Sequence, residues 1–283
     1  MKTSIKLLVT ITVVVAVFNY LAVINYKNKN NNKNANLTVN TKGKIIKKIA
    51  IFADIHDSTN TFEIALKQIP KDTFLFILGD SSNTGQTEEL LKIKNILQNY
   101  TIEYNILPGD RDVGLKGELP PPIGGYNFNK VFNENICDKQ YSIKLDNDKL
   151  FNIVCVNNPY NYTLLPKTYI EELKNNIQKA HLIIMSQPLQ NPGFNKYMGH
   201  LNKDVLKQAE EIKLEINKNK NIKYIISSDT HFFSRNSDIR VPDQTHITVG
   251  AITNERNLQS PRYLILNIFE DKSVEVKDVL VTY

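Results

Sequence analysis

Acidic and histidine side chains follow four apolar stretches of this 283-residue chain, at the point where each stretch ends. The first two stretches end in Asp54-Ile55-His56 and in Gly79-Asp80. The third ends in Gly109-Asp110-Arg111-Asp112, and a late one in Asp229-Thr230-His231. Carboxylate oxygens and imidazole nitrogens together suit zinc, iron or manganese. The pattern therefore predicts a site for divalent metal ions.

Each of these motifs is weak evidence when taken alone. On an extended segment, two residues with one residue between them point to the same side. Asp54 and His56 could therefore bind the same ligand. Asp54 could equally cap a following helix, and the Gly-Asp pairs could form turns. Four strand ends that all carry such residues are harder to explain by turns, which favours the metal site.

The elements that must position these residues alternate along the chain. Strands are expected at residues 49–53, 74–78, 104–107, 151–156, 182–185 and 224–226. Helices are expected between them at residues 61–68, 88–98, 167–179 and 202–217. Repeated strand-helix-strand units imply parallel strands with helices outside, and ligands bind at the carboxyl ends of such strands.

The C-terminal part shows a different pattern. Strand-like segments at 245–249, 263–269 and 274–281 follow one another with no helix between them, which suggests antiparallel strands that finish a second sheet. We therefore expect an α/β fold of two stacked mixed β-sheets flanked by helices, an αββα sandwich.

In this order and with these spacings, the four motifs resemble the motif series of the calcineurin-like metallophosphoesterases, over about residues 48–252. The resemblance implies a pair of metal ions at the strand ends, bridged by Asp80. One ion would be held by Asp54, His56 and His231, all of which are present. The first metal position therefore matches the family pattern.

Departures from that pattern fall on the second metal position. Asp110 stands where the family has Asn, and Asp229 where it has the first His of its Gly-His-x-His motif. Arg111 replaces a His assigned to assist the leaving group, and Ser186 replaces a metal-binding His. Carboxylates bind hard divalent cations well, so Asp110 and Asp229 stay candidate ligands. Ser186 is a poor substitute for an imidazole.

The resemblance implies the hydrolysis of a phosphomonoester or phosphodiester by a metal-activated water. The candidate metal ligands are Asp54, His56, Asp80, Asp110, Asp229 and His231, and the candidate catalytic residues are Arg111 and Asp112. One or two ions are expected. The two added carboxylates favour Mn²⁺ or Mg²⁺ over zinc, with iron a further possibility. Arg111 cannot donate a proton at neutral pH but can hold a phosphate with two hydrogen bonds.

Two other functions stay open. The replacements at Arg111 and Ser186 would suit an impaired member of the family that binds metal or phosphoester, or that serves as an interaction domain. Gly79-Asp80-Ser81 also resembles the nucleophile block of SGNH-type serine esterases, with Ser81 as nucleophile and a late Asp and His as its partners. The one-residue gap between Asp229 and His231 differs from that family's usual two, which argues against this reading.

Positive charge is concentrated at the start of the chain. The sequence has 35 Lys and Arg against 29 Asp and Glu, and residues 1–49 hold nine lysines and no acid. From residue 50 on, 26 basic groups face 29 acidic ones. The main part of the chain therefore has no bulk electrostatic reason to bind nucleic acid.

Residues 7–26 carry no charge and are long enough, as a helix, to cross the apolar core of a bilayer. A cleaved signal peptide and a buried helix are the alternatives, but no clear small-x-small cleavage pattern follows. We expect a tail at 1–6, a single-pass signal-anchor at 7–26, an Asn/Lys-rich linker at 27–46 and a metallophosphoesterase-like domain at 47–283. The lysines on the two sides of this segment are nearly equal in number, so the positive-inside rule does not decide its orientation. An anchor so near the start of the chain favours an extracytoplasmic domain.

Cysteine is too rare here for a disulfide scaffold or a thiolate zinc site, since only Cys137 and Cys155 are present. Cys155 lies in the apolar segment FNIVCV, which is typical of a small buried hydrophobic residue. A single disulfide between the two stays possible if the domain is exported.

Overall fold

The computed structural model describes residues 43–113, 125–137, 139–145, 149–160, 163–190, 193, 196–255 and 257–283. The expected tail, the expected membrane helix and nearly all of the expected linker lie outside these residues. No helix in the described ranges has the length and apolar character needed to cross a membrane.

The first sheet has five strands in the order β11-β10-β1-β2-β3. Its parallel part consists of β1 (Ile45–Ala53), β2 (Thr73–Leu78) and β3 (Tyr104–Leu107). Strand β10 (Arg262–Phe269) runs antiparallel to β1 on the edge opposite β2, and β11 (Val274–Leu280) runs antiparallel to β10. The carboxyl ends of β1, β2 and β3 therefore meet at one edge.

The second sheet has six strands in the order β4-β5-β6-β7-β9-β8. They are β4 (Gln140–Lys144), β5 (Leu150–Val156), β6 (Leu182–Met185), β7 (Tyr224–Ser227), β8 (Ser234–Ser237) and β9 (Thr245–Thr248). The four central strands are parallel, and the edge strands β4 and β8 are antiparallel to their neighbours.

The expected pair of mixed sheets is confirmed, but the placement of the last strands was wrong. Strands β10 and β11 complete the first sheet, not the second, and β9 pairs parallel with β7. The physical reason is that β1 has an open edge opposite β2, which β10 covers through backbone hydrogen bonds. The lack of intervening helices predicts antiparallel pairing between β10 and β11 but does not indicate which sheet has the open edge.

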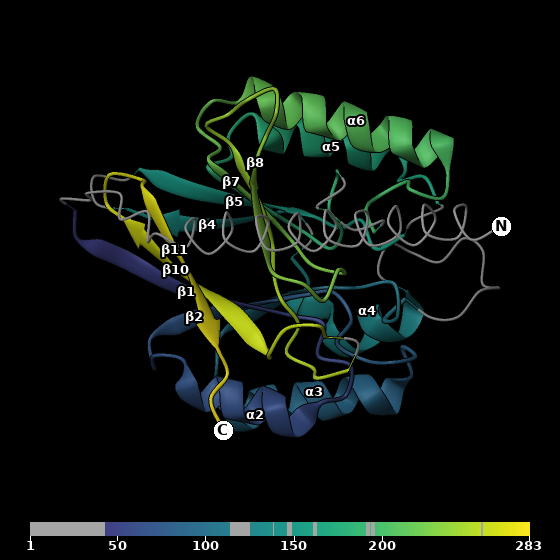
Figure 1. Cartoon of the computed structure of the whole chain (residues 1–283), viewed down its shortest axis with the longest axis vertical. Coiled ribbons are helices and arrows are strands. Elements are labelled where there is room, and N and C mark those ends of the chain that lie inside the picture. The colour runs from purple at the N-terminus through teal and green to yellow at the C-terminus, as the bar shows by residue number, and fades with distance from the viewer. Residues whose placement is uncertain are drawn as a thin grey trace, which may run out of the picture. The chain divides into compact units, whose positions relative to one another are not determined.

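Helices cover the outer face of each sheet (Figure 1). They are α2 (Thr59–Gln68), α3 (Thr87–Asn99), α4 (Tyr126–Phe132), the 3-10 turn Asn133–Asn135, α5 (Lys167–Ile177) and α6 (Lys203–Lys218). Residues of α2, α3 and α4 pack against the first sheet, and residues of α5 and α6 against the second.

The core has three apolar layers, because each sheet is buried on both faces. On β2, Phe74, Phe76 and Leu78 lie in the layer between the sheets, while Leu75 and Ile77 lie under the helices. This double burial explains why β2 reads as a continuous apolar segment in place of an alternating one. Rigid central strands of this kind hold the loops at their carboxyl ends in place.

A disulfide joins the two sheets. Cys137 lies next to the edge of β3, where its N–H donates to the carbonyl of Ile106, and Cys155 lies on β5. The two residues form a disulfide with a Cα–Cα distance of 5.9 Å. The bond that was left open from the sequence is therefore formed, inside the central layer of the core.

Candidate metal centre

The six residues proposed as metal ligands converge at the carboxyl ends of four strands. Asp54 and His56 follow β1, Asp80 follows β2, Asp110 follows β3, and Asp229 and His231 follow β7. They form two groups, and within each group the ligand atoms lie within 4.8 Å of one another. Asp80 belongs to both groups, so its carboxylate lies between them.

The loops that carry these residues have unusual backbone conformations. Positive φ angles between 27° and 70° occur at Asp54, His56, Asp57, Asp80, Asp229 and His231. Residues other than glycine rarely adopt positive φ, and each instance costs on the order of 1–3 kcal/mol. Such strain is kept where the surrounding structure imposes it, and its concentration in these loops supports a functional site.

The first group contains Asp54, His56, Asp80 and His231, all of them buried. The Nε2 atoms of the two histidines lie 2.9 Å apart, and His56 Nε2 lies 3.4 Å from Asp80 Oδ2. His231 Nδ1 lies 3.3 Å from the carbonyl oxygen of Glu255, which can only accept a hydrogen bond. A proton on Nδ1 leaves Nε2 as the coordinating nitrogen, in the usual manner of metal-binding histidines.

The electrostatics of the first group suit a cation. Burial, followed by the neighbouring His231, lowers the pKa of His56 to about 3, so its imidazole is neutral as a metal ligand requires. Burial and neighbouring acids, foremost Asp229 for Asp54 and Asp110 for Asp80, raise the pKa of both carboxyls well above the usual range. Asp54 Oδ2 is buried and has no hydrogen-bond partner among the described residues. Buried polar atoms are normally paired, so these residues fit a divalent ion.

The second group contains only carboxylates, from Asp80, Asp110 and Asp229. Burial is the main reason why the pKa of Asp229 rises to about 7. Asp110 Oδ1 and Asp229 Oδ2 are buried oxygens that accept no hydrogen bond within the described residues. This group therefore also needs positive charge, but it offers no imidazole.

Ser186, which the sequence resemblance matches to a metal-binding histidine of the family, directly follows β6 and is fully buried. Its carbonyl oxygen accepts a 2.6 Å hydrogen bond from the hydroxyl of Ser228, and its own hydroxyl has no partner in the described part of the chain. A short neutral hydroxyl cannot replace an imidazole ligand, so the second metal position does not fit the family's ligand set.

A residue that the sequence analysis missed, Lys196, lies beside this second group. Its Nζ lies 3.2 Å from Asp229 Oδ1 and donates to the carbonyl oxygen of Asp229 at 3.0 Å. Lys196 belongs to the connection between β6 and α6. A single lysine in a loop has no sequence pattern that would place it at the ends of strands elsewhere in the chain.

Arg111 is placed at the rim of the centre. Its backbone N–H donates to Asp80 Oδ1 at 3.0 Å, which fixes that carboxylate. Its side chain is 43% exposed, and its Nε lies 4.0 Å from Asp110 Oδ1. The guanidinium is therefore accessible to an anion from solvent and close to the second group.

Asp112 is buried beneath the site and belongs to neither metal group. Its carboxylate accepts hydrogen bonds of 2.9, 2.9 and 3.0 Å from the backbone N–H groups of Ser81, Ser82 and Gly109, and one of 2.8 Å from the Ser82 hydroxyl. These bonds join the loops after β2 and β3. We therefore expect Asp112 to position the loop of Asp80.

Gly109 permits the close approach of these two loops. A Cβ at this position would lie 2.1 Å from both the backbone nitrogen and Oδ1 of Asp80. No other residue type fits there unless Asp80 moves.

Ser81, the nucleophile in the serine esterase alternative, is fully buried. Its hydroxyl has no hydrogen-bond partner among the residues that the structure describes. A serine nucleophile needs a base within hydrogen-bond reach, so this arrangement does not support that chemistry.

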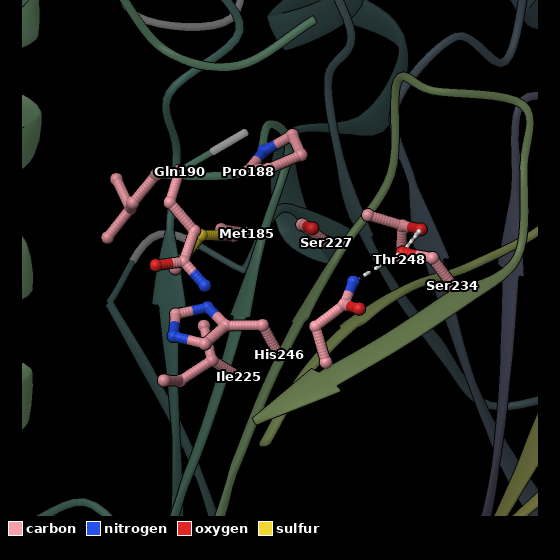
Figure 2. A pocket seen from close by; sticks show the side chains of 10 residues that line it. Met185, Pro188, Gln190, Ile225, Ser227, Ser234, His246 and Thr248 are labelled. Carbon is pink, nitrogen blue, oxygen red and sulfur yellow. Dashed lines mark hydrogen bonds between the residues drawn. The ribbon is translucent and has the colours of Figure 1, made fainter. Parts of the chain in front are cut away.

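A small cavity lies elsewhere, among side chains of β6, β7, β8 and β9 (Figure 2). Its lining includes Met185, Ile225 and His246, and it has room for about one water molecule. His246 Nε2 pairs with Asp238 Oδ2 at 2.9 Å and is not among the residues grouped at the metal centre. A phosphoester substrate does not fit in a space of this size.

Residues 47–233 match the family described as calcineurin-like phosphoesterase. The chain belongs to the calcineurin-like phosphoesterase family. Among curated protein sequences, none matches it significantly. The buried Asp/His cluster and the family fold of this calcineurin-like phosphoesterase support metal-dependent phosphoester hydrolysis with divalent ions.

Solved structures share the fold of this calcineurin-like phosphoesterase at low sequence identity. A dimetal phosphatase from Danio rerio has a TM-score of 0.58 and 10% identity, and the match covers 85% of this chain and 100% of that one. A purple acid phosphatase from yellow lupin, Lupinus luteus, has a TM-score of 0.56 and 11% sequence identity, and the match covers 85% of this chain and 52% of that one. GAP50, the anchor in the inner membrane complex of Plasmodium, has a TM-score of 0.53 and 14% sequence identity, and the match covers 85% of this chain and 88% of that one.

Proposed function

We propose that this protein hydrolyses a phosphomonoester or phosphodiester, with Asp54, His56, Asp80 and His231 holding a divalent metal ion. The observation that carries the proposal is their buried cluster, in which two imidazole Nε2 atoms lie 2.9 Å apart beside the carboxylate of Asp80. When bound, the ion would polarise a phosphoryl oxygen and lower the pKa of a bound water.

Arg111 is the proposed phosphate-binding residue. Its guanidinium is nearly half exposed at the rim of the centre, and it can give two parallel hydrogen bonds to phosphate oxygens. Its backbone N–H independently holds Asp80. Because the guanidinium stays protonated at neutral pH, we expect the best substrates to be esters with good leaving groups, which need no proton from the protein.

The donor set favours manganese within the proposal. The first group combines two carboxylates with two imidazoles, and two further carboxylates lie next to it. Carboxylates favour magnesium and manganese, whereas imidazoles favour transition metals. Mn²⁺ accepts both kinds of ligand, so it is the ion that we favour.

A second candidate function is a binding or anchoring role in which the centre holds metal with little turnover. The observation that favours it is Ser186, which offers no imidazole to the second metal position. GAP50 is described as an anchor in a membrane complex, so the fold itself is compatible with such a role.

We also propose that residues 7–26 anchor the protein in a membrane with the catalytic domain outside the cytoplasm. The twenty uncharged residues support the anchor. The Cys137–Cys155 disulfide supports an oxidising compartment, because such bonds are rare in the cytosol. Alkaline extraction of membranes and thiol labelling in intact cells test this, and a thiol pair that labels without reductant would contradict it.

The hydrolytic proposal is tested with nitrophenyl phosphate monoesters and diesters. We expect hydrolysis that stops on chelation and returns with Mn²⁺. An Arg111→Met variant should have a raised KM, while an Arg240→Met control should match the wild type, since Arg240 pairs with Glu210 on the surface. Bound metal without turnover of either ester would support the binding role in place of hydrolysis.

A further inference from the structure

The second group has more negative charge than the described residues neutralise with hydrogen bonds. It brings together the carboxylates of Asp80, Asp110 and Asp229, and Asp229 is only 2% exposed. Asp229 Oδ2 and Asp110 Oδ1 are buried without a hydrogen-bond partner in the described part of the chain. A positive charge at this point is therefore strongly favoured.

Lys196 brings such a charge. Its ammonium contacts Asp229 twice, at 3.2 Å from Oδ1 and 3.0 Å from the carbonyl oxygen. The Lys196 side chain is 45% exposed, but its ammonium contacts the carboxylate of Asp229, whose side chain is only 3% exposed.

We propose that the ammonium of Lys196 takes the place of a second metal ion, so that the centre binds a single divalent ion in the group of Asp54, His56, Asp80 and His231. Ser186 removes a nitrogen ligand from the second position, and Asp229 replaces another. An ammonium is a compact single charge with three donors, which suits a site made of carboxylate and carbonyl oxygens. This inference rests on the proposed first metal position but not on turnover.

Metal stoichiometry tests the proposal directly. The full-length chain, purified in detergent, is loaded with Mn²⁺ and dialysed, and bound manganese is measured by elemental analysis. We expect about one equivalent for the wild type and about two for Lys196→Met, because the three carboxylates then lack their ammonium. Lys207→Met is the matched control, since Lys207 is 80% exposed and pairs with Asp204 on its own helix.

The electron paramagnetic resonance spectrum of bound Mn²⁺ gives a second readout that does not depend on activity. Isolated Mn²⁺ is expected in the wild type and in Lys207→Met, and an exchange-coupled pair in Lys196→Met. The side chain of Lys196 is 45% exposed, so loss of folding is not expected in Lys196→Met. Thermal unfolding of each variant checks this.

The remaining outcomes overturn the proposal in distinguishable ways. Two equivalents with a coupled spectrum in the wild type would show that Lys196 does not exclude the second ion, while leaving the hydrolytic function intact. One equivalent in all three proteins would show that Lys196 has another role, such as binding substrate phosphate. No bound metal in any protein would contradict this inference and the proposed function together.

Discussion

Among single residues, Asp80 is the one on which the centre depends most. Its carboxylate belongs to both groups of acidic and histidine side chains, and the N–H of Arg111 holds Oδ1 at 3.0 Å. The loop after β3 approaches it so closely that only glycine fits at position 109. Changes that touch neither substrate nor metal can therefore disturb the site through Asp80.

Gly109→Ala is expected to weaken metal binding. The new Cβ would lie 2.1 Å from Asp80 Oδ1, so the carboxylate must move. Displacing a supporting group costs about 10–100-fold in metal affinity, and displacing the ligand itself should reach at least that range. Titration calorimetry with Mn²⁺ measures this loss of metal affinity. Gly43→Ala is the control, because its Cβ would make only an ordinary 3.6 Å contact, and an unchanged affinity in Gly109→Ala would contradict the account.

Asp112→Asn is expected to destabilise the fold by about 1–3 kcal/mol. The carboxylate accepts hydrogen bonds from the N–H groups of Ser81, Ser82 and Gly109, and an amide NH₂ would face one or more of these donors. Denaturant unfolding measures the loss. A variant that keeps wild-type stability and metal affinity but loses turnover would show that Asp112 takes part in the chemistry itself.

His181 is expected to make stability depend on pH. Its Nδ1 accepts from the N–H of Asn152, and its Nε2 lies 2.9 Å from the ammonium of Lys272. Burial, and then Lys272, lower the pKa of His181 to about 4 in the folded protein, below its ordinary value of 6.5. The unfolded state therefore binds the proton first, and stability falls as pH drops from about 6.5 to about 4.

Unfolding of the wild type and of His181→Gln across this pH range isolates the effect. The wild type should lose more of its free energy of unfolding than the variant does. Parallel curves would contradict the assignment.

At the scale of elements, the apolar strands were predictable, and two polar strands at the edges of the second sheet were not. Apolar segments such as β2 and β6 are read directly from sequence, because burial on both faces makes them continuously apolar. Strands β4 and β8 were missed, since their exposed, polar residues lie at sheet edges. The same limit applies to Lys196, whose contact with Asp229 joins the connection after β6 to the loop after β7.

The disulfide is expected to stabilise the protein by about 3 kcal/mol, the value for a closed loop of similar length. Cys137 and Cys155 are separated by 18 residues and join the edge of the first sheet to β5. Urea unfolding of Cys137→Ala/Cys155→Ala against the oxidised wild type measures this. Equal midpoints, or free thiols in the wild type, would contradict the bond.

For the whole molecule, the sequence separates a basic start from a body that folds as one unit. Residues Thr41–Tyr283 form that compact unit, and the metal-binding motifs all lie within it. Six ligand positions could be proposed from sequence because each lies in a loop just after a strand, where the fold brings side chains together. Their distances, and the share of positive charge supplied by Lys196, depend on how the two sheets pack and could not be read from spacing.

The most direct test of the central claim is the rate of nitrophenyl phosphate hydrolysis by the metal-stripped protein before and after Mn²⁺ is restored, compared with Asp80→Asn. Asparagine keeps the shape of Asp80 but removes the charge shared by both groups. We predict that Mn²⁺ restores hydrolysis to the wild type, whereas Asp80→Asn stays at least about 100-fold slower, the upper range for lost supporting groups alone. Equal rates in the two proteins, or hydrolysis that survives removal of metal, would contradict the account.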